Sequence, residues 1–212
     1  MIFLILGYGI PKDILKDENY NLYLKIAFNQ IFDVAKEKSA TIIFSGGKTG
    51  NLPPYKRTEA NEMARLFKTI TNGHEKQQNW KILKEDKSIS TLENLVNGYE
   101  MVERKKLAGI IYIICEKTRE KRIGIIAKKI FKNKVKIISI DFDQSDNRYL
   151  PEKEIEEREN KALKNYLIAL SDAKKYKGHH DLCLKKFDFL KKQKPNNYTK
   201  AVRQYWKIEN KI

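Results

Sequence analysis

Cysteine is nearly absent from this sequence: its 212 residues include only Cys115 and Cys183. Two cysteines cannot form a disulfide framework, and their separation matches no metal-ligand spacing. We expect both thiols to be reduced, with Cys115 buried at the end of a strand.

Hydrophobic runs long enough to cross a membrane are also lacking. The opening run, residues 2–6, reads IFLIL and is far too short to span a bilayer. It has neither the basic start nor the small-residue cleavage site of a signal peptide. We therefore expect a first β-strand here, and a cytoplasmic protein without a membrane span.

Arginine is scarce in a strongly basic chain. Lysine and arginine together number 43, only eight of them arginine, and the formal net charge is +16. Lysine, isoleucine and asparagine are plentiful throughout, which is typical of a genome-wide bias in composition. Such a charge favours polyanions non-specifically and with strong salt dependence. Because no continuous basic arm stands out, nucleic-acid binding is the alternative and not the leading interpretation.

The familiar nucleotide-binding motifs are incomplete. The run Gly46–Thr49 resembles the end of a Walker A loop, but Ile42 stands where that loop requires glycine. The run Gly7–Gly9 lacks the third glycine of the dinucleotide fingerprint. The ribose-binding acid expected at the end of the second strand is replaced by the run Ser45–Gly47. These gaps argue against P-loop chemistry and against NAD binding.

What the chain does have is a regular alternation of strand and helix patterns. Short apolar runs alternate with segments of helical spacing, which predicts parallel strands joined by right-handed crossovers. We expect an α/β, Rossmann-like three-layer fold with a mostly parallel five-stranded sheet in residues 1–145. A C-terminal helical extension, residues 146–212, is expected to pack on it. The predicted strands are Ile2–Leu6, Thr41–Phe44, Trp80–Leu83, Gly109–Ile114 and Val135–Ile140.

The extension is expected to be a series of helices. Pro151 followed by several glutamates fits a helix start, with acids at the positive end of the helix dipole. We predict one helix from there to about Tyr176, stopped by Gly178. Two shorter helices are expected at 181–192 and 199–208.

Glycine, hydroxyl and charged residues gather where the predicted strands end. The carboxyl ends of parallel strands share one edge of the sheet, and ligands bind at this edge. The loop Ser45-Gly46-Gly47 is the strongest feature, because glycine lets several N–H groups approach a ligand. It is followed by Lys48, and we interpret it as a cradle for a phosphate or carboxylate. The residues at this edge are Gly7, Gly9, Ser45, Gly46, Gly47, Lys48, Glu85, Ser88, Thr91, Glu93, Asn94, Cys115, Glu116, Arg119, Arg122, Asp141 and Asp143.

Two helix starts at this edge have more than one interpretation. Ser90 and Glu93 fit a capping box, while Ser88 and Thr91 fit an anion site at a helix N-terminus, and both can hold together. Glu59 begins the helix after the Ser-Gly-Gly loop. It is either an acid favoured by the helix dipole or a base or metal ligand.

The order of these motifs resembles the YdcF/SanA-like family, a domain of unknown function with a Rossmann-like fold. The matching motifs are Ser45-Gly46-Gly47, Thr58-Glu59-Ala60 with Met63, and Glu85-x-x-Ser88-x-x-Thr91-x-Glu93-Asn94, followed by Arg122 after the fourth strand. The resemblance covers residues 1–143 and implies that these polar residues form the family's site. It implies no defined activity. Some members of the family are linked to envelope or cell-wall processes, and S-adenosylmethionine binding has been suggested for one branch, so the resemblance leaves the cofactor of this chain undefined.

The sequence departs from the family pattern in one region that matters for catalysis. Cys115, Glu116 and Arg119 stand where the family usually has threonine, serine and histidine, and only Lys25 loosely replaces an arginine of the amino-terminal part. Loss of the histidine removes the obvious proton carrier at neutral pH. Anion binding is retained, because Arg119 and Arg122 can both hold phosphate or carboxylate.

The tail carries residues that could be mistaken for a site. His179, His180, Asp181 and Cys183 match no standard metal-ligand spacing, so no metal is expected there. Its aromatic residues are expected to pack helices onto the sheet instead of stacking on bases. These aromatic residues are Tyr198, Tyr205 and Trp206.

The leading hypothesis is a domain that binds a small anionic or nucleotide-like metabolite and acts on it as a hydrolase or transferase. Glu59 and Glu85 are the candidate acid and base groups. The alternative is a non-catalytic basic module whose tail binds nucleic acid or a protein partner. The predicted ligand-binding residues are Gly7, Gly9, Ser45, Gly46, Gly47, Lys48, Ser88, Thr91, Glu93, Asn94, Arg119 and Arg122.

Overall fold

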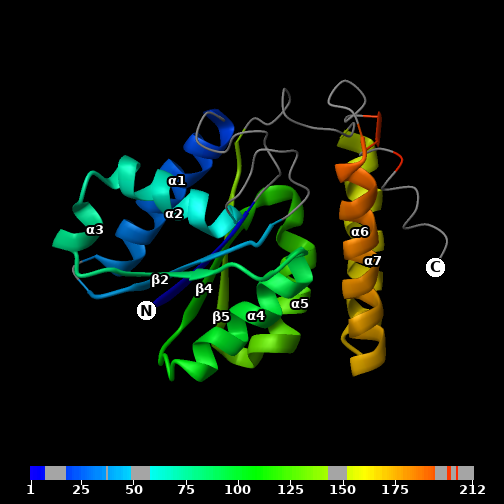
Figure 1. The fold of residues 1–212 in the computed structure, drawn as a ribbon. Coiled ribbons are helices and arrows are strands. Elements are labelled where there is room, and N and C mark those ends of the chain that lie inside the picture. Colours follow the sequence, from blue (N-terminus) through cyan, green and yellow to red (C-terminus); the bar gives the residue numbers. More distant parts are fainter. Residues whose placement is uncertain are drawn as a thin grey trace.

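A five-stranded, all-parallel sheet forms the centre of the molecule in a computed structural model of the chain (Figure 1). The structure describes residues 1–7, 18–36, 38–48, 58–142 and 152–193, and the single positions 200, 201 and 204. Gly9, Asp143 and the aromatic residues predicted to pack the end of the tail lie outside the described residues, as does most of the helix predicted at 199–208.

The strand order is β3-β2-β1-β4-β5, and every neighbouring pair is parallel. Strand β1 is central and buried along its whole length, which explains its uninterrupted apolar sequence. The predicted α/β, Rossmann-like fold is therefore confirmed. The strands are β1 (Ile2–Leu6), β2 (Thr41–Ser45), β3 (Lys81–Glu85), β4 (Ile111–Glu116) and β5 (Val135–Ile140).

Helices cover both faces of the sheet, because the crossovers run outward in opposite directions from β1 (Figure 1). On one face, α1 (Glu18–Ala35) and α2 (Glu59–Thr71) bury aromatic and aliphatic side chains against β1 and β2, with the short α3 (His74–Gln77) beyond α2. On the other face, α4 (Thr91–Arg104) and α5 (Glu120–Phe131) enclose the second half of the core.

The tail forms two long helices beside α5, α6 (Glu152–Ala169) and α7 (Ala173–Lys191) (Figure 1). Tyr166 and Ala169 join the core cluster of α4 and α5. The predicted break at Gly178 is wrong, because α7 runs through it. The chain turns earlier, where Asp172 caps α7 by accepting a hydrogen bond from Lys175 N at 2.8 Å.

The arrangement creates a switch point at the carboxyl ends of β1 and β4, where the chain leaves the two strands toward opposite faces of the sheet. The short helical turn η1 (Lys117–Arg119) follows β4 directly and leads into α5. None of the helices in the described ranges is long and apolar enough to cross a membrane.

Candidate functional site

The edge residues predicted from sequence come together in the sheet. Parallel pairing aligns Leu6 with Ser45, and Ser45 with Glu85, so that three adjacent strands end in one row. Gly7 follows this row on β1, and Glu59 begins α2 just beyond the Ser-Gly-Gly loop. The edge separates into three polar regions, each with a different set of partners.

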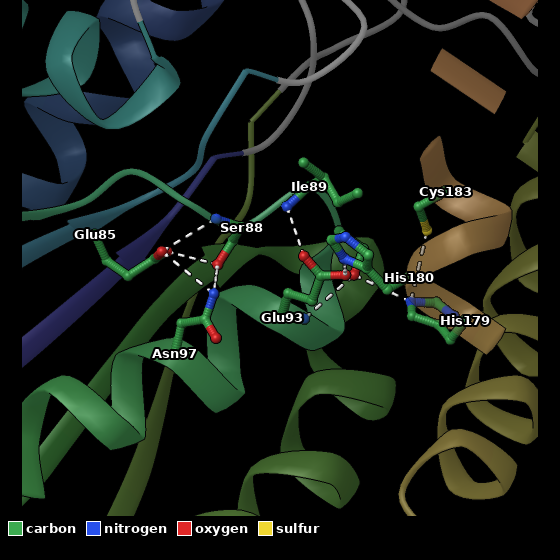
Figure 2. Close-up of polar contacts among 9 residues, drawn as sticks. Glu85, Ser88, Ile89, Glu93, Asn97, His179, His180 and Cys183 are labelled. Atoms are coloured by element: carbon green, nitrogen blue, oxygen red, sulfur yellow. Dashed lines mark hydrogen bonds and ion pairs between the residues drawn. The ribbon is translucent and has the colours of Figure 1, made fainter. Parts of the chain in front are cut away.

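The first region is centred on the buried carboxylate of Glu85, which is 4% exposed. Oε2 accepts hydrogen bonds from Ser45 Oγ at 2.5 Å and from Ser88 Oγ at 2.6 Å. Oε1 accepts from the backbone N–H of Lys87 at 2.9 Å and of Ser88 at 3.1 Å, and more distantly from Asn97 Nδ2 at 3.4 Å. Figure 2 shows Ser88 and Asn97 turned toward this carboxylate.

Such a carboxylate holds a loop in shape. Donors of the protein itself occupy both oxygens, which indicates that Glu85 fixes the β3–α4 loop, and its role as an acid or base stays a prediction. The hydroxyls of Ser45 and Ser88 both donate to Glu85, and their role as ligand donors stays a prediction.

The backbone of Gly46 and Gly47 serves the same loop. Gly46 N donates to Glu85 O at 2.9 Å, and Gly47 N donates to Ser88 O at 2.7 Å. The expectation that these two N–H groups face an anion is therefore wrong, since both are donated inside the protein. The glycines are required by space: a Cβ on Gly47 would lie 2.5 Å from Ser88 O. Lys48 follows on the exposed surface.

The second region is the N-terminus of α4, which the tail helices contact (Figure 2). Ser90 caps the helix as predicted, accepting from Glu93 N at 3.2 Å. The Glu93 carboxylate accepts from Ile89 N at 2.9 Å and lies 3.0 Å from His180 Nδ1 of α7. His179 Nε2 lies 3.1 Å from Ser90 Oγ. The capping interpretation is confirmed, because Ser90 and Glu93 both accept hydrogen bonds from backbone N–H groups at the start of α4. The two histidines of α7 add contacts to these two side chains.

Arg122 joins this second region from the first turn of α5. Its Nε and Nη2 form a bidentate pair with the Glu159 carboxylate of α6, at 2.6 and 3.1 Å. The guanidinium lies 4.9 Å from the centre of the Tyr166 ring, and the Tyr166 hydroxyl hydrogen-bonds the Thr91 side chain. Burial lowers the pKa of the Arg122 guanidinium, but the interactions with Tyr166 and Glu159 together keep it above its usual range. Thr91, Glu93 and Arg122 are thus all in contact with the tail.

The third region is centred on Glu59, at the switch point. Tyr20 of α1 donates a hydrogen bond from its hydroxyl to Glu59 Oε1 at 2.6 Å. A Cβ on Gly7 would lie 2.0 Å from Glu59 Oε1, and one on Gly46 would lie 2.6 Å from Oε2. The two glycines therefore make room for this carboxyl group between β1 and β2.

The carboxyl group of Glu59 has a raised pKa. Burial raises the pKa of its carboxyl group to about 7, against smaller lowering effects of the Tyr20 hydrogen bond and the Arg119 charge. The residue is still partly exposed. The raised pKa argues against an acid that is held only by the helix dipole, which would have a lowered pKa, and the role of Glu59 as a base or metal ligand stays a prediction.

Arg119 stands beside Glu59 at the end of β4. Its Nη1 donates to Gly7 O at 2.9 Å, and its Nε lies 3.9 Å from Glu116 Oε2. The Glu116 side chain also accepts from Thr118 N at 2.8 Å, which caps η1. The neighbouring Cys115 is not a nucleophile at neutral pH, because burial raises the pKa of its thiol to about 12. Both cysteines are free thiols, as predicted.

Nothing in the described part of the chain resembles a metal centre, since no three acidic, histidine or cysteine side chains come together there. His179 and Cys183 lie near each other, with Nε2 and Sγ 3.7 Å apart. The two histidines hold α7 against α4, and they point to different partners, Ser90 and Glu93.

Sequence reasoning missed the partners contributed by other elements. Each of these partners contacts a residue at the predicted edge: Tyr20, Glu159, Tyr166 and the pair of histidines in α7. Glu159 and Tyr166 are about two turns apart on α6, and neither carries a local sequence signal of its own. The adjacent histidines were noticed in the sequence, but only as a possible metal site that their spacing argued against.

Comparison of the chain with protein-family models, with curated proteins and with solved structures finds no match in any of the three. The similarity of its motifs to the YdcF/SanA-like family therefore stays a prediction.

Proposed function

We propose that the chain binds a small anionic or nucleotide-like metabolite at the switch point, and that Glu59 exchanges a proton with it in a hydrolase or transferase reaction. The observation that carries the proposal is the position of Glu59. Its buried carboxyl group, with a pKa of about 7, lies beside Gly7 at the end of β1, where Arg119 donates a hydrogen bond to Gly7 O.

A carboxyl group with this pKa is suited to general acid–base catalysis. The best acid–base group has a pKa near the working pH, because both protonation states are then populated. In the family pattern a histidine after the fourth strand would supply such a group, and here Arg119 replaces it. Glu59 takes over the proton-carrying role in this proposal, and Arg119 contributes charge that binds the anion.

Ligand binding tests the first half of the proposal. We expect adenosine monophosphate, a sugar phosphate or S-adenosylmethionine to raise the melting temperature of the wild-type chain. The variant Arg119→Gln should lose this shift, whereas Arg104→Gln, at an exposed arginine on α4, should keep it. The absence of any shift with all three compounds, or equal shifts in the two variants, would contradict the proposal.

Kinetics test the second half. Once a turned-over ligand is found, kcat/KM should change with a midpoint near pH 7, set by the free Glu59 carboxyl group. Glu59→Gln should lower kcat by about 100-fold or more while binding persists. Unchanged turnover in Glu59→Gln would remove Glu59 from the reaction.

A second candidate function is a basic module that binds nucleic acid through the tail. The observation that favours it is a set of exposed lysines on α7, including Lys174, Lys177 and Lys185. Replacing these three by glutamate should abolish low-salt binding of single-stranded RNA in a fluorescence-anisotropy assay. No binding by the wild-type chain in the same assay would contradict this function.

A further inference from the structure

Two buried polar atoms, one on α4 and one on α5, have no hydrogen-bond partner among the described residues. They are Nη1 of Arg122 and Oδ1 of Asn94. The two residues are 4% and 6% exposed. An unmet buried donor or acceptor is destabilising, so native proteins leave few of them. One unmet donor and one unmet acceptor in the same region point to a ligand that satisfies both.

Tyr166 places the two residues on the same side of α4. Its ring lies under the Arg122 guanidinium, and its hydroxyl hydrogen-bonds Thr91, the first residue of α4. Asn94 is three residues after Thr91, and residues three apart share a face of a helix. Asn94 therefore lies on the side of α4 that Tyr166 contacts, and Tyr166 in turn packs against Arg122.

Glu159 fixes the orientation of the donor. Its carboxylate binds Nε and Nη2 of Arg122 in a fork, and the side chains of this pair are only 5% and 12% exposed. A bidentate pair of this kind holds the guanidinium plane, so the third nitrogen has a fixed direction. Glu159 is in this sense a positioning residue for Arg122.

We propose that Arg122 Nη1 and Asn94 Oδ1 bind the part of a ligand where a hydroxyl group stands beside an anionic oxygen. The guanidinium nitrogen donates to the anionic oxygen, and the amide oxygen accepts from the hydroxyl group. The inference rests on the proposed function, and it defines the ligand as a hydroxyl-bearing anion. Hydrogen phosphate, through its P–OH group, and a sugar phosphate both have this chemistry.

The tail helices cover this subsite. The contacts of Glu159, Tyr166, His179 and His180 hold α6 and α7 over the first turn of α4. Because both unpaired atoms are fully enclosed, a ligand reaches them when α6 and α7 move outward. Ligand entry should therefore increase amide hydrogen exchange in α6 while the first turn of α4 becomes protected.

The preference for phosphate over sulfate tests the subsite, because the two dianions have the same shape and only hydrogen phosphate carries a hydroxyl group. By isothermal titration at pH 7.5, the wild-type chain should bind inorganic phosphate about tenfold more tightly than sulfate, the value of one hydrogen bond. Asn94→Ala should remove the preference, and the exposed control Asn29→Ala should keep it. Equal affinity for the two anions in the wild type, or a preference retained in Asn94→Ala, would overturn the inference.

The two sources of this chemistry are separated by a further pair of probes. Ribose 5-phosphate binding more tightly than methyl phosphate, with the difference lost in Asn94→Ala, identifies a sugar hydroxyl as the second group. Equal binding of these two esters, with the phosphate preference intact, identifies the P–OH group of inorganic phosphate. Loss of both preferences in the wild type contradicts the subsite.

The role of Glu159 has its own matched pair of variants. Glu159→Gln should weaken phosphate binding about tenfold, because the orientation of Arg122 is lost, while Glu157→Gln, at an exposed glutamate one half-turn away on α6, should not. Near-ultraviolet circular dichroism establishes that both variants are folded, and Glu159→Asp should partly restore binding. Equal affinities in Glu159→Gln and Glu157→Gln would overturn the positioning role.

Failure of this inference is distinguishable from failure of the proposed function. If Arg119→Gln abolishes binding of adenosine monophosphate while Asn94→Ala leaves the phosphate-to-sulfate ratio unchanged, the switch-point site stands and the subsite does not. If Asn94→Ala abolishes the preference for phosphate over sulfate while Arg119→Gln leaves adenosine monophosphate binding unchanged, the subsite stands and the proposed function does not.

Discussion

Two glutamates at the same edge of the sheet, Glu85 and Glu59, have opposite surroundings. Glu85 accepts hydrogen bonds from two serine hydroxyls and two backbone N–H groups, all within 3.1 Å. Glu59 accepts one from Tyr20, and burial raises the pKa of its carboxyl group to about 7. Both were predicted as acid–base candidates, Glu85 as a residue at a strand end and Glu59 as the start of the helix after the Ser-Gly-Gly loop.

The comparison teaches that the number of donors around a buried carboxyl group decides its role. Donors aimed at both oxygens stabilise the charged form and fix the group in place. With one donor and little solvent, the neutral form gains, and the proton becomes exchangeable near neutral pH. The first environment builds a loop, and the second is suited to moving a proton.

The largest effect is expected when the Glu85 centre is removed. Glu85→Ala leaves the Ser45 and Ser88 hydroxyls and two backbone N–H groups without their buried acceptor, so we expect a loss of about 3–5 kcal/mol in the free energy of unfolding. Urea denaturation measures it, with the exposed Glu103→Ala on α4 as the control. A loss below about 1 kcal/mol would show that Glu85 does not hold the loop.

Neutralising Glu59 should increase the free energy of unfolding, opposite to the effect of removing Glu85. The folded-state pKa of about 7 is above the unfolded value of 4.5, so the folded protein binds the extra proton between these values and loses stability as the pH rises through them. Glu59→Gln removes this loss. At pH 8 it should be more stable than the wild type by up to about 3 kcal/mol, with the advantage shrinking toward pH 5.

Urea denaturation of both proteins at several pH values measures this difference. Glu62→Gln, on the same helix, serves as a control for a neutralised glutamate. Parallel stability curves for wild type and Glu59→Gln between pH 5 and 8 would mean that the Glu59 carboxyl group titrates at an ordinary pKa.

The two glycines beside these centres should respond differently to a methyl group. In Gly47→Ala the new Cβ would lie 2.5 Å from the backbone Ser88 O, which cannot move without the loop, so a loss of about 1–3 kcal/mol is expected. In Gly7→Ala it would meet the flexible end of Glu59, which can turn aside. Thermal denaturation should show a larger loss of stability for Gly47→Ala than for Gly7→Ala. The reverse order would contradict the rigid surroundings of Gly47 and the flexible surroundings of Gly7.

The smallest effect is expected from Tyr20→Phe. The Tyr20 hydrogen bond lowers the pKa of Glu59, so its removal should raise that pKa above about 7 and cost about 1 kcal/mol of stability. Titration of the Glu59 carboxyl group in the variant measures the direction of the change. A pKa that falls would show that the hydroxyl group does not stabilise the carboxylate.

Local sequence patterns were sufficient for the sheet but not for the partners of the edge residues. Strands β1 and β5 have the predicted bounds, because buried parallel strands are continuous apolar runs. The carboxyl-edge rule brought Gly7, Ser45 and Glu85 to one row. The rule does not predict which side chains bond to these residues, because the partners are distant in sequence: Tyr20 is 39 residues from Glu59, and Glu159 is 37 residues from Arg122.

The break between α6 and α7 also shows the limit of local sequence patterns. Gly178 is a helix breaker by propensity, yet it lies inside α7 with no atom of another element near it, and the cap at Asp172 determines where α7 begins. A capping side chain and the burial of Tyr166 and Ala169 outweigh one unfavourable glycine. Helix propensity alone placed the break between the two helices at Gly178, whereas α6 ends at Ala169.

The most direct test of the account is the titration of Glu59 itself. In protein carrying ¹³C-labelled glutamate, the side-chain carboxyl resonance that disappears in Glu59→Gln belongs to Glu59. The account predicts a midpoint near pH 7 for this resonance. A midpoint near the ordinary value of about 4.5 would contradict it and would remove the proton carrier on which the proposed chemistry depends.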